Sequence, residues 1–168
     1  RIINPMLPDE PGTKVNQCVE NILKHWKEGD ADRLTQIVFC DISTPSGAPA
    51  GTSPEAICPT FTNIYDDIRQ KLIAGGMAPE QIAFIHSANT DIQKKELFAK
   101  VRSGQVRVLI GSTQKMGAGT NVQDRLIALH DLDCPWRPRD LIQRKGRIER
   151  RGNRNQKVHV YRYVTNGT

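Results

Sequence analysis

The stretch that decides the fold is residues 82–110, IAFIHSANTDIQKKELFAKVRSGQVRVLI. Its first five residues predict one strand and its last five predict the next. Between them, Thr90 or Asp91 can cap a helix that continues to about Arg102, with Gly104 beyond its end. A strand, a helix and a strand in this order are typical of a βαβ unit, whose two strands lie parallel in one sheet.

The same alternation continues on both sides of this unit. Further helices are predicted at residues 14–28, 63–74 and 140–150, and further strands at 36–42, 126–129 and 158–164. The fold class is therefore α/β, with a mostly parallel central sheet flanked by helices. At 168 residues the chain fits one domain with a hydrophobic core, which we assign to residues 14–168.

Two segments are expected to lie outside this core. Residues 1–13 carry three prolines and are predicted to be a lead-in or linker, and residues 43–60, with four prolines and two glycines, are predicted to be an exposed loop. The chain lacks an initiator Met, so we expect it to be a piece of a longer polypeptide.

Several protein classes are disfavoured by composition. No run of 18 or more apolar residues indicates a membrane helix, and no apolar segment near the start indicates a signal peptide. The four cysteines show neither C-x-x-C spacing nor neighbouring histidines at zinc-finger intervals, so no metal site is expected. Reduced thiols in a cytoplasmic protein are the simpler interpretation.

The positive charge is concentrated in one segment. Residues 137–157 hold nine Lys or Arg and two acids, a net charge of +7 in a chain whose total is +6. Such a patch indicates a polyanion as partner, either nucleic acid or nucleotide phosphate. A solvated basic helix face is the alternative.

The most informative part of that segment is residues 141–150, LIQRKGRIER. On a helix, Gln143, Gly146, Arg147 and Arg150 lie on one face. Two guanidiniums one turn apart can clamp phosphate oxygens, and in phosphoryl transfer such arginines stabilise the charge of the transition state. The glycine would let another surface approach closely. A surface helix that makes ordinary ion pairs would show similar residues.

A second informative stretch is residues 111–121, GSTQKMGAGTN, directly after a predicted strand. Gly117 and Gly119 free the backbone for a tight turn. The side chains that can reach phosphate oxygens are Ser112, Thr113, Lys115 and Asn121. An ordinary strand-to-helix connection remains the alternative. His86 and Asn89, at the end of another predicted strand, are weaker candidates for the same contact, because a polar loop with a helix cap also explains them.

These stretches resemble the motifs of superfamily 2 helicases, in the right order. Q-x-x-G-R-x-x-R at 143–150 looks like motif VI, residues 111–121 like motif V and residues 36–41 like the strand of motif IV. DCPWRP at 133–138 resembles the D-x-P-W-N-P segment of Swi/Snf-type translocases. The resemblance covers about residues 14–164. It is greatest to helicase regions of large bacterial mobile-element proteins, some of which also carry a DNA adenine methyltransferase.

The resemblance implies the second RecA-like lobe, a three-layer α/β domain, of an ATP-dependent helicase or translocase. Arg147 and Arg150 would act as arginine fingers on ATP held by the first lobe. Residues supporting the ATP site would be Gln143, Gly146, Gly119 and Asn121. Residues contacting the DNA backbone would be Ser112, Thr113, Lys115, His86 and Asn89.

Other motifs of a complete ATPase are not found in this sequence. There is no G-x-x-x-x-G-K-[ST] phosphate loop and no D-E-x-H box for Mg²⁺. ATP and Mg²⁺ would therefore be held mainly by the first lobe of the same polypeptide, and the isolated chain is expected to be inactive.

Three positions depart from the resemblance: Lys145 replaces a usually apolar residue, Arg137 a common Asn, and Gln114 a frequent Lys. They weaken the subfamily assignment but not the fold. The alternative function is a RecA-like module that binds nucleic acid or acts as a scaffold without hydrolysis. A Rossmann-type enzyme is disfavoured because no G-x-G-x-x-G follows an early strand.

Overall fold

The structure is a computed structural model that describes residues 14–41, 64–113, 115–116, 121–132, 138–149 and 151–163. At positions 138, 140, 141 and 147 it describes the backbone only. The predicted linker at 1–13, the predicted loop at 43–60 and the D-C-P-W-R-P segment before 138 lie outside the described residues, as do Gly117, Gly119 and Arg150.

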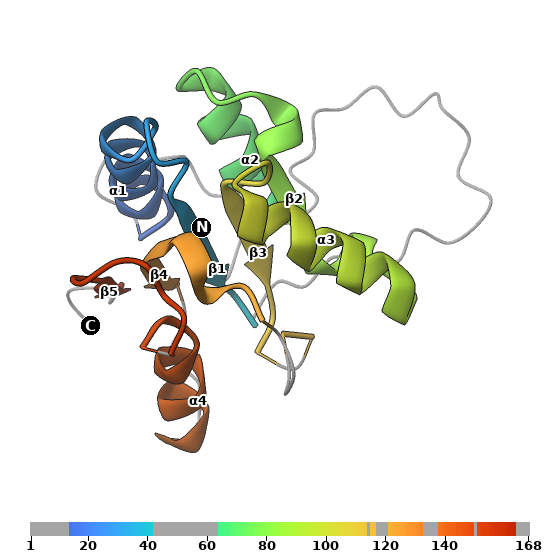
Figure 1. Cartoon of the computed structure of the whole chain (residues 1–168). Helices are drawn as coiled ribbons and strands as arrows, with labels where there is room; N and C mark the ends of the chain where they lie inside the picture. Colours follow the sequence, from blue (N-terminus) through green and yellow to red (C-terminus); the bar gives the residue numbers. More distant parts are fainter. Residues whose placement is uncertain are drawn as a thin grey trace.

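A parallel sheet forms the centre of the molecule (Figure 1). Its strands are β1 (Thr35–Phe39), β2 (Ile82–Phe84), β3 (Val108–Gly111), β4 (Leu126–Asp131) and β5 (His159–Arg162). They lie in the order β2-β3-β1-β4-β5, and every neighbouring pair is parallel. The predicted α/β class with a parallel sheet is confirmed.

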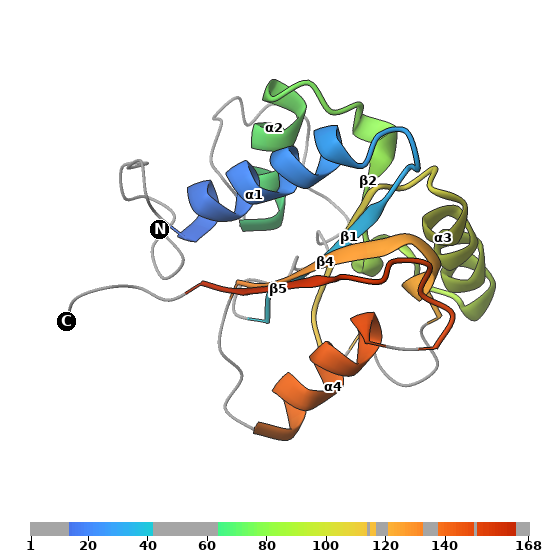
Figure 2. The same cartoon turned by 60° about the vertical axis from the view of Figure 1, so that its left-hand side comes forward.

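Helices cover both faces of the sheet (Figure 2). The helices α1 (Lys14–Glu28) and α2 (Ile64–Ala74) share one core with Val38 and Cys40 of the β1 segment. The helices α3 (Asp91–Ser103) and α4 (Pro138–Ile148) contribute to a second core, with Ile37 and Phe39. Since side chains alternate between the two faces of a strand, β1 supplies both cores, and three layers result.

Local sequence signals account for the limits of α3. Thr90 is its N-cap: its hydroxyl accepts a hydrogen bond from the Gln93 N–H, and the Gln93 side chain accepts one from the Thr90 N–H, which completes a capping box. Gly104 ends the helix in the left-handed region, with φ 81°. Both predicted boundary signals of this helix are confirmed.

Several strand boundaries were wrong: the strand predicted at 36–42 ends at Phe39, and the one predicted at 126–129 continues to Asp131. The strand predicted at 82–86 ends at Phe84, and residues Ile85–Ser87 form a short 3-10 helix closed by the hydrogen bond from Ala88 N–H to Ile85 O. His86 therefore lies in a turn beyond the sheet edge. An apolar Ile85 suggested a longer strand, but its side chain is buried in the second core from the turn as well.

A buried polar network fastens α1 to the sheet. The His130 ring donates from Nε2 to Gln36 Oε1 at 2.8 Å and accepts at Nδ1 from the Tyr163 hydroxyl at 2.8 Å. Gln36 donates onward to the carbonyl of Ile22, and Asn21 donates to the Tyr163 hydroxyl. Complete burial lowers the pKa of His130 to about 3, so the ring stays neutral near pH 7.

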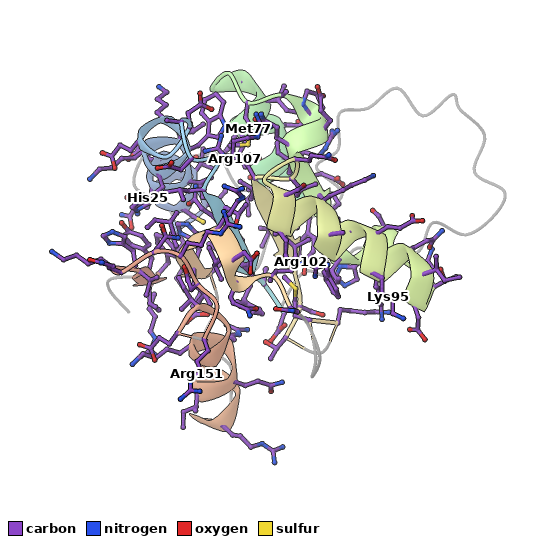
Figure 3. The ribbon with its side chains drawn as sticks, in the orientation of Figure 1. His25, Met77, Lys95, Arg102, Arg107 and Arg151 are labelled. Atoms are coloured by element: carbon purple, nitrogen blue, oxygen red, sulfur yellow. The ribbon has the colours of Figure 1, made fainter. Side chains whose placement is uncertain are left out.

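A buried arginine closes the amino edge of the sheet. Arg107, labelled in Figure 3, has a side chain that is 0% exposed. It donates to Asp30 Oδ1 at 2.9 Å, to Leu34 O at 2.6 Å and to Trp26 O at 2.9 Å. These bonds tie the start of β3 to the connection between α1 and β1. Burial lowers the pKa of Arg107, while the Asp30 carboxylate opposes that effect.

No helix in the described ranges is long and apolar enough to cross a membrane. Cys18 and Cys40 are both buried.

Candidate functional site

The carboxyl ends of three adjacent strands meet at one edge of the sheet, as parallel strands require. Asp41 follows β1, Thr113 follows β3 and Asp131 ends β4. The Thr113 N–H donates to Asp41 Oδ1 at 2.6 Å, and its hydroxyl donates to Asp41 Oδ2 at 2.8 Å. The ends of β1 and β3 are thereby joined through side-chain hydrogen bonds.

Arg144 of α4 inserts into this edge. Its Nη2 donates to Asp41 Oδ2 at 2.8 Å, its Nη1 to Asp131 Oδ1 at 3.2 Å, and its Nε to Thr113 Oγ1 at 2.8 Å. The guanidinium also lies over the Phe39 ring, 5.0 Å from its centroid. We call Arg144, Asp41, Thr113 and Asp131 the edge cluster.

The edge cluster brings the buried charges of Arg144 and Asp131 into contact, with the partly exposed Asp41 beside them. The Arg144 side chain is 0% exposed, that of Asp131 is 3% exposed and that of Asp41 is 35% exposed. Asp131 Oδ2 also forms an ion pair with Arg162 Nε of β5, at a distance of 3.6 Å. Removing one partner from such a pair leaves an uncompensated buried charge, which typically costs about 3–5 kcal/mol. The cluster therefore fixes α4 against the sheet.

The residue spacing explains which face of α4 is inward. Arg144 and Ile148 are four residues apart, lie on the same face and are both buried. Gln143 and Gly146 are exposed, and a Cβ placed on Gly146 would meet nothing within 4 Å in the described structure. The predicted ATP-supporting positions on α4 thus lie on its outer side, open to another surface.

The two predicted arginine fingers are only partly placed. The backbone of Arg147 belongs to α4, but its side chain is not described, and Arg150 lies outside the described residues. Their proposed contact with ATP stays a prediction.

Among the predicted nucleic-acid contacts, Ser112 and Thr113 are engaged within the protein. Ser112 is buried, and its hydroxyl accepts a hydrogen bond from the Lys115 N–H at 3.2 Å. Thr113 donates to Asp41 from both its N–H and its hydroxyl. The side chain of Lys115 is exposed, so it is the most accessible of the three.

His86 and Lys115 follow the neighbouring strands β2 and β3, although they are distant in the sequence. Burial lowers the pKa of His86, and the nearby charge of Lys115 lowers it further. The His86 ring packs edge-on against Tyr65, with centroids 5.3 Å apart, and its Nδ1 is buried without a hydrogen-bond partner in the described ranges. Asn89 is exposed, and its N–H donates to Gln93 Oε1 at 2.8 Å.

Asn121 lies apart from the edge cluster. Its carbonyl accepts a hydrogen bond from Arg102 Nη1 at 2.7 Å, and Arg102 is in the last turn of α3. That end of α3 precedes β3, so Asn121 is placed toward the amino edge of the sheet.

Arg144, Asp41 and Asp131 were not predicted from the sequence as a set. A signal was present, because Arg144 is four residues before an apolar position of an amphipathic helix, and an acid follows the β1 run. That the three residues meet depends on β1, β3 and β4 being neighbours, which no local pattern specifies.

No metal site is apparent in the part of the chain that the structure describes. It contains no group of three or more His, Cys, Asp or Glu able to hold a metal ion, and the carboxylates of Asp41 and Asp131 both contact Arg144. The donors present therefore do not fit a Mg²⁺ site.

Comparison with known proteins gives the family and the fold. The family model "Helicase conserved C-terminal domain" matches residues 56–152, more than half of the chain. No curated protein matches.

Solved structures with a similar fold include the C-terminal part of the Fun30 ATPase domain, with a TM-score of 0.64 and 15% identity over 95% of this chain and 44% of that one. The DUF1998 helicase MrfA bound to DNA and AMPPNP gives a TM-score of 0.62 and 12% identity over 97% of this chain and 19% of that one. At these identities the likeness concerns the fold, which is RecA-like as expected. The chain spans less than half the length of either protein.

Proposed function

Because this chain belongs to the helicase conserved C-terminal domain family, we propose that it is the second lobe of an ATP-driven DNA helicase or translocase. In this proposal Arg147 and Arg150 stabilise the charge on the γ-phosphate of ATP that a first lobe of the same polypeptide holds. The first lobe also supplies the phosphate loop and the Mg²⁺ ligands. The Swi/Snf-like D-C-P-W-R-P segment favours translocation along DNA over other activities on nucleic acid.

The observation that carries the proposal is the family match combined with the orientation of α4. Arg144 and Ile148 face the sheet, so Gln143 and Gly146 face outward on the side where a first lobe could dock. The open space over Gly146 supports close approach of a second surface. The basic segment at 137–157 supports a polyanionic partner.

The proposed cycle follows from these placements. ATP binding between the lobes draws them together and brings the arginines to the γ-phosphate. Closure shifts the loop at 111–121, which includes the exposed Lys115, relative to the DNA backbone. Hydrolysis releases the lobes, and repeated closure and opening produces stepping. Contacts to phosphate make the binding tolerant of sequence and sensitive to salt.

The test is DNA-stimulated ATP hydrolysis by the complete two-lobe protein. Arg147→Ala and Arg150→Ala should each lower kcat by about a thousandfold, as expected for arginine fingers. The isolated chain should show no hydrolysis.

Arg151→Ala is the matched control, because Arg151 is an exposed arginine directly after the motif at 143–150 (Figure 3). It should leave hydrolysis within about twofold, since exposed charges contribute little individually. Equal hydrolysis in wild type and in both finger variants would overturn the motif VI assignment and leave the segment as a binding surface. No hydrolysis in any form, with DNA binding intact, would favour a non-hydrolysing module.

A further inference from the structure

We propose that Arg144 is the positioning residue that couples the ATP-facing helix α4 to the DNA-facing loop after β3. This inference rests on the proposed function and adds a specific route between its two sites. Nothing in the spacing of the finger motif assigns such a role to Arg144, because its side chain points away from the outer face of α4.

The first step is the number of separate elements that one guanidinium joins. Arg144 bonds to the ends of β1, β3 and β4 through Asp41, Thr113 and Asp131, at 2.8, 2.8 and 3.2 Å. The guanidinium fork is planar and its donors have fixed directions. A shift of α4 that breaks one of these bonds therefore strains the other two.

The second step is the hold on Thr113, the residue at which the loop leaves the sheet. Its N–H and hydroxyl both donate to Asp41, and the same hydroxyl accepts from Arg144. The next residues of the loop are turned back by hydrogen bonds from Lys115 N–H to Ser112 Oγ and from Met116 N–H to Ser112 O. A displacement of Arg144 therefore displaces Thr113, and with it the exposed Lys115.

The third step separates this role from simple stabilisation. Arg107, at the opposite edge of the sheet, is an equally buried arginine with an acidic partner and two backbone carbonyls. Its partners belong to α1 and to the connection between α1 and β1, and they include no predicted DNA or ATP contact. If buried arginines only hold this fold together, the two residues should behave alike.

The experiment measures thermodynamic coupling in the complete two-lobe protein. The affinity for a DNA duplex is measured with and without the non-hydrolysable nucleotide AMPPNP, and the affinity for AMPPNP with and without DNA. By linkage, both pairs of measurements must give the same coupling factor, which is commonly between about 5 and 150. Thermal unfolding is recorded for each variant.

Arg144→Lys keeps the charge but loses the fork, and Arg107→Lys makes the same change at the other edge. Both should lower Tm. Only Arg144→Lys should reduce the coupling factor to below about 2, with the separate affinities for DNA and nucleotide changed by less than about threefold. If Arg144→Lys does not fold, Asp41→Asn replaces it as the test variant, because it is a milder change at a partly exposed partner. Asp41→Asn should reduce the coupling factor partially.

A wild-type coupling factor retained in Arg144→Lys or in Asp41→Asn, despite a lower Tm, would overturn the proposal and leave the edge cluster as a fold-stabilising element. An equal loss of coupling in Arg107→Lys would also overturn it. A wild-type protein that binds neither DNA nor AMPPNP would instead refute the proposed function on which this inference rests.

Discussion

His130 shows how a single residue can make the stability of this fold depend on pH. The ring is fully buried, stacked on Tyr161 with centroids 5.2 Å apart, and hydrogen-bonded at both nitrogens. Its pKa is about 3 in the folded protein, against about 6.5 in an unfolded chain. The unfolded state therefore binds a proton between these values that the folded state does not bind.

This difference fixes the sign of the pH effect. As pH falls from about 6.5 toward 3, protonation of the unfolded state lowers the free energy of unfolding, by about 1.4 kcal/mol per pH unit from His130 alone. Denaturant titrations of the isolated domain between pH 5 and 6 should approach this slope, and the slope should vanish above about pH 7. His130→Gln should lower the slope of the free energy of unfolding against pH by about 1.4 kcal/mol per pH unit. Glutamine keeps polar atoms for the hydrogen bonds with Gln36 and Tyr163. An identical slope in this variant would mean that other groups carry the dependence.

At the scale of a single helix, the two faces of α4 have different roles. The inner face is fixed by Arg144 and Ile148, while the outer face carries Gly146 where the described structure leaves open space. Glycine within a helix costs about 0.5–1 kcal/mol relative to alanine. Its presence on an open face therefore has no benefit for the isolated chain.

Gly146→Ala tests whether the benefit lies in contact with a first lobe. The substitution should raise the Tm of the isolated domain by a few degrees, because it stabilises the helix by about 0.5–1 kcal/mol. In the complete protein, it should lower ATP-hydrolysis kcat by about tenfold or more, since a methyl group would hold the second surface off. Gly104→Ala is the control for backbone effects.

At Gly104, with φ 81°, the added Cβ would lie 2.6 Å from Arg33 Cβ, so this variant should lose stability. A gain in Tm at Gly146 with unchanged hydrolysis would show that the first lobe does not approach α4 there.

The helices and strands also show how much of the structure could be predicted from the sequence. The helix at 14–28 was predicted with its observed bounds, because α1 has a regular apolar spacing. The strand at 82–86 was predicted two residues too long, because Ile85 is apolar for a reason unrelated to the sheet. Arg144 was not singled out, because a buried arginine and an exposed one look the same until the partners from β1 and β4 are in place.

At the scale of the whole molecule, the parallel α/β class followed from the alternation of strands and helices, but the strand order did not. The edge cluster depends on that order, since β1 lies between β3 and β4. Positions of the candidate contacts were therefore only partly predictable. His86 and Lys115 both follow the adjacent strands β2 and β3, whereas the Asn121 carbonyl is bonded to Arg102 at the end of α3.

The uneven charge of the molecule predicts how DNA binding responds to salt. With the positive excess concentrated at 137–157, the logarithm of the DNA affinity should fall linearly with the logarithm of salt concentration. Lys115→Gln should make this slope shallower by about 1, as for loss of one phosphate contact. Lys95→Gln, on the exposed side of α3, is the control (Figure 3). Equal slopes for wild type and Lys115→Gln would remove Lys115 from the DNA contacts.

The central position of β1 also governs how the chain can reach this fold. Gln36 of β1 pairs with Val108 of β3 and with Ala128 of β4, both much later in the sequence. In contrast, β2 and β3 are joined by the short segment 85–107, which contains α3, and can associate locally. During synthesis, β1 leaves the ribosome before β3 and β4. Both of its edges therefore stay unpaired until those two strands have been made. This apolar strand is therefore the segment whose premature pairing with another chain would most readily divert folding into aggregation.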